Sequence, residues 1–133
     1  MSDLSMLING LKVSAEGGTT FERRNPLDGS VATRAPAASP ADAVLAVEAA
    51  AEAFKSWSQT GPGARRALLL KAADALEAKT PQFIDAVSAE TGATGMWAGF
   101  NVMLAAGMIR EAASLTTQIS GEVIPSDVPG SLA

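Results

Sequence analysis

Residues 39–119 consist of alanine-rich, periodic segments divided by glycine and proline, and this pattern predicts four consecutive helices. Ser39-Pro40-Ala41-Asp42 places a serine at the N-cap, a proline at the first helical position and an acid at the third. Gly61-Pro62-Gly63 ends this helix and opens the second, over roughly residues 64–78. The chain is therefore predicted to be mainly helical beyond Ser39.

The third and fourth helices have similar boundary signals. Thr80-Pro81 repeats the cap-plus-proline signal, and Gly92 is the predicted C-terminal glycine of the third helix. The fourth and longest helix is predicted over residues 95–119. The predicted inward positions of the first three helices are Val44, Val47, Ala51, Phe54 and Trp57, then Leu69, Ala72, Ala73 and Leu76, then Phe83, Ile84 and Val87.

Before these helices, residues 1–35 favour short strands. Asn9-Gly10 lies between two β-prone runs and predicts a hairpin over residues 7–13. Gly17-Gly18 predicts a second turn, and residues 19–24 and 31–34 predict strands on either side of a turn at Asp28-Gly29. We expect a small antiparallel β meander, four helices and, after residue 121, an extended tail.

Composition excludes several kinds of chemistry. The net charge of −4 and the scattered basic residues argue against a nucleic-acid partner. The chain has no cysteine and no histidine, which removes thiolate nucleophiles and the commonest general base and metal ligand. The loop at Asp28, Gly29 and Ser30 offers too few oxygen ligands for a metal. The carboxylate pairs Asp85/Glu90 and Glu48/Glu52 are interpreted as surface charges, so no catalytic, cofactor-binding or metal-binding residue is predicted.

One segment requires a membrane hypothesis to be weighed. Residues 91–109 carry no charge and contain Gly95-x-x-x-Gly99, a spacing found in membrane helix dimers. The run also holds several glycines and Asn101, and it lacks flanking basic clusters, which favours a buried helix in water. The first residues carry no basic stretch typical of a secretory signal, so we expect a cytoplasmic protein without a membrane partner.

The fourth helix is the candidate for ligand contact. Trp97, Phe100, Leu104 and Met108 fall on one stripe, with Asn101 at its margin. From the residues alone, simple core packing is the favoured explanation of this stripe. Gly95 and Gly99 each cost about 1 kcal/mol relative to alanine in a helix, so their presence predicts close approach of another backbone or side chain.

Six short motifs in order resemble the opening segment of aldehyde dehydrogenases. Each motif is weak alone, and the order makes the resemblance specific over essentially the whole chain. The motifs are Leu7-Ile8-Asn9-Gly10; Phe21 with Asn25-Pro26-x-x-Gly29-x-Val31; Asp42 to Trp57 with Ala46-Val47-x-Ala49-Ala50; Arg65-x-x-x-Leu69-Leu70-x-Ala72-Ala73-Asp74; Glu90-Thr91-Gly92; and Gly121-Glu122-Val123-Ile124-Pro125.

The resemblance implies an α/β fold in which residues 1–120 form the first part of a cofactor-binding domain and residues 121–133 begin an oligomerisation β-ribbon. Members of this family oxidise aldehydes with NAD or NADP through a cysteine, with a glutamate activating water. The matching motifs stop before those residues, so this chain alone is expected to be inactive and to bind no cofactor. Its expected partners are a small aldehyde, the remainder of its own polypeptide and further copies in a homo-oligomer.

The resemblance also implies a role for the stripe on the fourth helix. The matching helix of the family lines the aldehyde entry tunnel. The resemblance therefore implies that the wall of this tunnel includes Trp97, Phe100, Asn101, Leu104 and Met108. The stripe is uncharged and aromatic, which favours an apolar aldehyde, and the motifs look most like salicylaldehyde, vanillin and benzaldehyde dehydrogenases. Two alternatives stay open: a segment of a succinate-semialdehyde-type dehydrogenase, and a stand-alone helical interaction or structural module.

Overall fold

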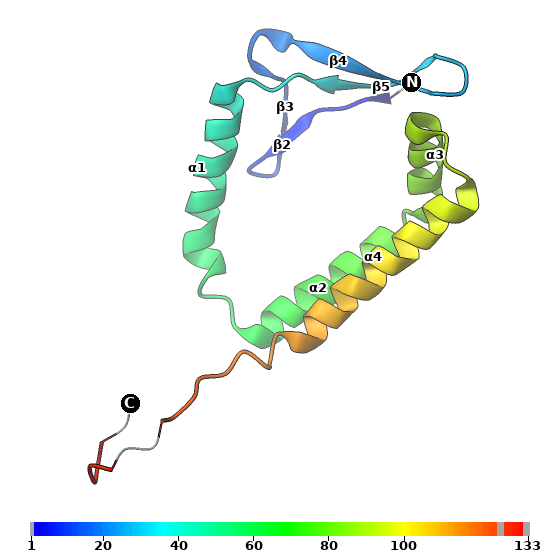
Figure 1. Ribbon diagram of the computed structural model, residues 1–133. Helices are drawn as coiled ribbons and strands as arrows, with labels where there is room; N and C mark the ends of the chain where they lie inside the picture. The colour runs from blue at the N-terminus through cyan, green and yellow to red at the C-terminus, as the bar shows by residue number, and fades with distance from the viewer. Residues whose placement is uncertain (1, 125–126, 132–133) are drawn as a thin grey trace.

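The computed structural model describes residues 2–124 and 127–131, and Figure 1 shows how its elements are arranged. In chain order these are β1 (Ser2–Asp3), β2 (Met6–Ile8), β3 (Leu11–Val13), the 3-10 turn η1 (Glu16–Gly18), β4 (Thr20–Arg24), β5 (Val31–Pro36), α1 (Pro40–Trp57), α2 (Pro62–Glu77), α3 (Thr80–Thr91) and α4 (Gly95–Leu115).

Both predicted antiparallel strand pairs are present. β2 and β3 form the hairpin with Ile8 opposite Leu11, and Asn9 and Gly10 have positive φ angles of 51° and 74°, as a type I′ turn requires. β4 pairs antiparallel with β5 in a second, separate sheet, to which β1 adds a parallel strand in the order β1-β5-β4. The strands therefore form two small sheets, because η1 redirects the chain between β3 and β4.

The start of α1 follows the sequence prediction. Ser39 caps the helix and its hydroxyl accepts a hydrogen bond from the Asp42 backbone N–H, while the Asp42 carboxylate accepts one from the Ser39 N–H at 2.8 Å. The same carboxylate accepts from the Glu16 N–H at 3.0 Å. These backbone donors lower the pKa of Asp42. Asp42 thus joins α1 to η1.

Two helix boundaries differ from the prediction. Thr80 is not the N-cap of α3, because Lys79 occupies that position and the Thr80 hydroxyl instead donates to the Glu77 carbonyl at 2.6 Å, at the end of α2. α4 ends at Leu115 rather than at Ile119. There the Thr116 hydroxyl donates to the Ala113 carbonyl at 2.9 Å and competes with the helical hydrogen-bond pattern.

After α4 the described residues carry no helix or strand, and the tail projects away from the rest of the molecule (Figure 1). The predicted β-ribbon segment 121–133 is only partly covered, because Pro125, Ser126, Leu132 and Ala133 lie outside the described residues. Its assignment to an oligomerisation ribbon stays a prediction. None of the helices in the described part of the chain combines the length and apolar character that crossing a membrane requires.

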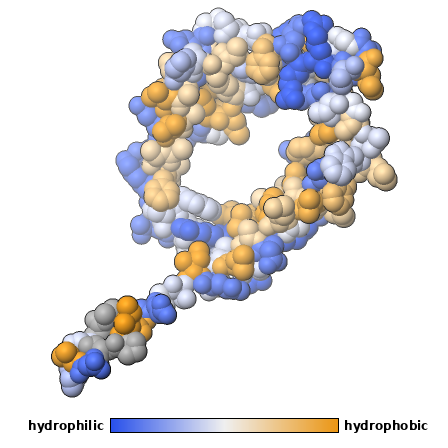
Figure 2. Space-filling model, in the orientation of Figure 1, coloured by the Kyte–Doolittle hydropathy of each residue, from blue (hydrophilic) through white to orange (hydrophobic). Residues whose placement is uncertain are grey.

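The elements form a ring. The two sheets, α1, the α2–α4 pair and α3 surround an opening in Figure 1, and Figure 2 shows that side chains do not close it. The buried apolar residues of the described chain are small: Ala15, Ala73, Ala98, Val102, Ala106 and Ala113. In contrast, each of the four Phe and two Trp side chains is at least 39% exposed.

The prediction of an inward apolar face therefore fails for α1. Its apolar stripe exists, but Val44, Val47 and Phe54 are more than half exposed and Trp57 is 42% exposed. Ala72 of α2 is also exposed, whereas its neighbour Ala73 is fully buried. The physical reason is that α1 has few neighbours: it contacts β2, and no other helix of the described residues lies alongside it (Figure 1).

Candidate functional site

The candidate site lies on α4, which packs against the rest of the molecule through small residues. The helix begins at Thr94, whose hydroxyl accepts a hydrogen bond from the Trp97 N–H at 3.3 Å. Its buried residues are Ala98, Val102, Ala106 and Ala113, and its neighbours are α2 and α3. The helix is thus held by one narrow face of small side chains.

The two glycines at the start of α4 face Ile84 of α3. A Cβ atom added at Gly95 would lie 3.4 Å from Ile84 Cγ2, and one added at Gly99 would lie 3.5 Å from Ile84 Cδ1. The nearest group is a side chain of the preceding helix, and an added Cβ at either glycine would be in ordinary van der Waals contact with it, so the close backbone approach predicted for this pair stays a prediction. Small residues of α4 therefore turn toward α3, which leaves its large side chains on other faces.

Those large side chains form an exposed stripe. Trp97, Phe100, Leu104 and Met108 are between 44% and 65% exposed, and Asn101 is exposed beside them. The rings of Trp97 and Phe100 stack with a centroid separation of 5.6 Å and an interplanar angle of 28°. The structure thus brings all five predicted residues to one accessible face, although their role in substrate contact stays a prediction.

Two further apolar residues beside this stripe were missed by the sequence prediction. Met96 is 85% exposed and Met103 is 60% exposed. They lie four residues before and three residues after Phe100, so the same helical spacing would have identified them. The exposed surface of α4 is consequently wider than the predicted stripe, and the two methionines give it adaptable edges.

The amide of Asn101 is directed at its own helix. Its Nδ2 donates to the Trp97 carbonyl at 2.8 Å. This bond fixes the side chain one turn from Trp97 and joins it to the aromatic end of the stripe. Because residues 91–109 contain no charged side chain, Asn101 supplies the main polar group on this face.

The first charge after this neutral run is Arg110, which binds α2. Its guanidinium donates to both carboxylate oxygens of Glu77, at 2.7 and 2.8 Å, and to Asp74 Oδ1 at 2.8 Å. The hydrogen bonds from Arg110 hold the pKa of Glu77 below its usual range, and those from Glu77 and Asp74 raise the pKa of Arg110. The sequence showed where the neutral run ends, but not which acids the arginine contacts.

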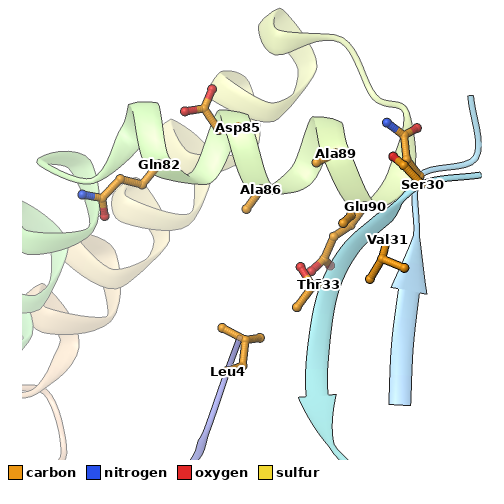
Figure 3. A pocket seen from close by; sticks show the side chains of 11 residues that line it. Leu4, Ser30, Val31, Thr33, Gln82, Asp85, Ala86, Ala89 and Glu90 are labelled. Atoms are coloured by element: carbon orange, nitrogen blue, oxygen red, sulfur yellow. The ribbon is translucent and has the colours of Figure 1, made fainter. Parts of the chain in front are cut away.

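A cavity of about 560 Å³ lies between β5 and α3 and includes both members of the Asp85/Glu90 pair among its lining residues. Glu90 forms an ion pair with Arg23 of β4 at 3.1 Å. Figure 3 shows Glu90 directed toward β5 and Asp85 directed away from it. The two carboxylates therefore do not converge on a common point, and the cavity does not form an acid–base pair.

The Asn-Pro-x-x-Gly turn contacts the junction between α3 and α4. Asn25 Oδ1 accepts from the Leu27 N–H at 2.9 Å, and Asp28 accepts from the Ser30 hydroxyl and N–H, which lowers the pKa of Asp28. Gly92 has the left-handed φ of 72° predicted for a helix C-terminus. A Cβ atom there would lie 3.1 Å from Pro26 Cγ. Two separate sequence motifs thus meet at this junction.

Comparisons with known proteins cover the same region. The family model described as "Aldehyde dehydrogenase family" matches residues 12–133. Vanillin dehydrogenase from Pseudomonas fluorescens is 55% identical over 133 residues, which is all of this chain and 27% of that protein.

Two solved structures are also similar. The crystal structure of a salicylaldehyde dehydrogenase from Pseudomonas putida G7, complexed with salicylaldehyde, matches with a TM-score of 0.93 and 46% identity over 99% of this chain and 27% of that one. The NAD-dependent benzaldehyde dehydrogenase from Corynebacterium glutamicum matches with a TM-score of 0.85 and 32% identity over 93% of this chain and 27% of that one. The chain thus spans about a quarter of the length of the relatives it matches.

Proposed function

Because this chain belongs to the aldehyde dehydrogenase family and has that family's fold, we propose that it serves as the N-terminal part of a longer enzyme. That enzyme oxidises an aromatic aldehyde to its carboxylic acid with NAD or NADP. The observation that carries this proposal is the 55% identity to a vanillin dehydrogenase along the whole chain. The similar salicylaldehyde and benzaldehyde dehydrogenases support the same substrate class.

The reaction centre lies outside this chain in the proposal. A thiolate that attacks the aldehyde carbonyl and later leaves from the thioester requires a cysteine, and the chain has none. Nor does it contain a histidine that could serve as a base. We therefore expect the remaining part of the enzyme to supply the nucleophile, the base and the cofactor site.

The contribution of this chain is a wall of the aldehyde entry tunnel. The stacked rings of Trp97 and Phe100 offer a flat apolar surface, and Leu104 and Met108 extend it along α4. An aromatic aldehyde can stack on such rings, and no charged side chain of residues 91–109 disfavours it. A carboxylated aldehyde, such as a succinate semialdehyde, would require a basic group from another segment.

The solvent-exposed surface area of the chain bears on what fills the opening between its helices and sheets. The chain exposes 9674 Å². A compact monomer of 13.5 kDa exposes about 6,500 Å², which leaves an excess of roughly 3,200 Å². This excess is typical of large obligate interfaces. We propose that the rest of the polypeptide fills the opening, and that residues 121–133 begin the ribbon through which subunits pair.

The proposal is tested in the longer enzyme with Trp97→Ala and Phe100→Ala. Removal of one ring is expected to lower kcat/KM for salicylaldehyde by about tenfold relative to propanal, since a lost apolar contact is worth about 1–3 kcal/mol. Phe54→Ala is the matched control, because Phe54 is also exposed but lies on α1. An unchanged ratio of the two aldehydes in both α4 variants would remove the tunnel-wall role.

Three observations separate the proposal from its alternatives. Faster oxidation of succinate semialdehyde than of salicylaldehyde would replace the aromatic substrate class. A reading frame that ends at Ala133 would favour the stand-alone module, in which case a different protein covers the exposed faces. Turnover of any aldehyde by the 133-residue chain alone would contradict the placement of the reaction centre.

A further inference from the structure

The best-buried residues shared by α2 and α4 are small. Ala73, Ala106 and Ala113 are fully buried and carry only a methyl group each. Such side chains let two helices approach closely but offer no directional contact between particular residues. At the start of α4, Gly95 and Gly99 face Ile84 of α3.

Arg110 makes directional contacts between the two helices. Its three hydrogen bonds reach Glu77 at the last residue of α2 and Asp74 one turn earlier. A planar guanidinium that donates to two carboxylates favours a narrower range of geometries than a single point charge does. Within the described residues, Arg110 makes the only ion pairs between α2 and α4.

We propose that Arg110 is a positioning residue that sets the register of α4 on α2 and so fixes where the Trp97–Phe100 pair lies in the aldehyde tunnel. This inference rests on the proposed function of the stripe. Trp97 precedes Arg110 by thirteen residues, or about 20 Å along the helix. The helix transmits a slide at Arg110 to the rings undiminished, because it is continuous from Gly95 to Leu115.

The size of the effect follows from helix geometry. Loss of the ion pairs allows α4 to slide by a fraction of its repeat of about 5.4 Å per turn. In the proposed tunnel wall the rings contact the substrate away from its reacting carbon, so a displacement weakens binding, by about tenfold for one lost apolar contact. A large aromatic aldehyde that fills the tunnel senses this displacement, whereas a small aliphatic aldehyde has room to adjust. Arg110 thus acts on selectivity rather than on the chemical step.

The test uses Arg110→Gln in the longer enzyme, assayed with salicylaldehyde and with propanal. We expect KM for salicylaldehyde to rise about tenfold with kcat changed less than twofold, and KM for propanal to stay within about twofold. Arg110→Lys keeps the charge without the planar fork and is expected to restore only part of the affinity. Arg23→Gln is the matched control, because it removes another exposed arginine ion pair, between β4 and α3, without contacting α4.

A second variant keeps the test valid if Arg110→Gln folds poorly. Asp74→Asn with Glu77→Gln leaves Arg110 in place, removes its acceptor charges and is expected to reproduce the selectivity shift. Equal losses with both aldehydes, or no loss in either variant, would overturn the positioning role. If the unmodified enzyme oxidises no aldehyde with NAD or NADP, the proposed function fails and this inference fails with it. If it is active but its selectivity is insensitive to Arg110, only this inference fails.

Discussion

The Gly92→Ala substitution tests the contact between the Asn-Pro-x-x-Gly turn and the α3–α4 junction. Gly92 adopts φ 72° and ψ 10°, a left-handed conformation that a side chain disfavours. It also lies against the turn, because an added Cβ would be 3.1 Å from Pro26 Cγ and 3.5 Å from Leu27 Cγ. The substitution therefore meets two separate penalties.

The conformational and packing penalties of Gly92→Ala can be separated by comparison with a substitution at Gly29. Gly29 has a matching φ of 73°, but an added Cβ there meets no atom within 4 Å. Gly29→Ala should cost the conformational penalty alone, about 1 kcal/mol. Gly92→Ala should cost about 2 kcal/mol, because the proline ring must also shift by a few tenths of an ångström. The difference between the two variants estimates the packing contact.

Amide hydrogen exchange of the longer enzyme is the assay, since it reports local opening in a protein of any size. A loss of about 2 kcal/mol accelerates exchange by about thirtyfold, which we expect for peptides covering residues 88–97 in Gly92→Ala. Gly29→Ala should leave those peptides unchanged and accelerate exchange about fivefold in residues 24–31.

A double-mutant cycle with Pro26→Ala decides the outcome. Removal of the proline ring should recover about 1 kcal/mol of the Gly92→Ala cost, since the Cγ atom is then absent. The reasoning is refuted if the two substitutions are additive, or if Gly92→Ala costs no more than Gly29→Ala. Either result would mean that residue 92 at the α3–α4 junction and Pro26 of the turn are not in packing contact.

Three further outcomes are expected. The stability that Asp42 supplies is fully present above the ordinary pKa of an aspartate, about 4, and is lost as the pH falls through the lowered pKa that Asp42 has in the folded chain. Circular dichroism from pH 7 to 2 should therefore show an acid transition, and Asp42→Asn should weaken it. Gly107→Ala should stabilise α4 by about 1 kcal/mol and so raise the helix content of the isolated chain, because an added Cβ meets no atom within 4 Å. The isolated chain should be helical yet bind a hydrophobic dye and self-associate in light scattering; a monomer that unfolds cooperatively without dye binding would contradict this.

Local signals in the sequence were sufficient for most of the secondary structure. The Asn9-Gly10 hairpin, the Ser39–Asp42 capping box and the left-handed Gly92 each depend on neighbours within a few residues, so their geometry can be predicted without knowing the fold. The Thr80 prediction failed for a related reason. Its hydroxyl had two backbone partners within reach, and the carbonyl of Glu77 prevailed over the N–H groups of α3.

Long-range arrangements could not be predicted in this way. The partners of Arg110 lie 33 and 36 residues away on another helix, and no periodicity of either helix identifies them. The same limit applies to the separation of the two sheets and to the contact between Gly92 and Pro26. For the stripe, the sequence defined the face of α4 but not its exposure, because helical spacing is identical in a core and in a cavity wall.

The exposed fractions place this stripe outside any core formed by the described residues, and the distribution of large and small apolar residues departs from the usual one. Independent domains bury many of their large apolar side chains together with many of their alanines. Among the residues that the structure describes, the buried apolar ones are five alanines and a valine, whereas both tryptophans and all four phenylalanines are exposed. The alanines join the helices of the ring to one another, and the large side chains are left for contacts with something else. Trp97 and Phe100 follow this division on a single helix, because Ala98 and Val102 beside them are buried. An aromatic pair retained at an accessible, uncharged face is therefore better explained as a surface for a partner or substrate than as an unfilled core of this chain.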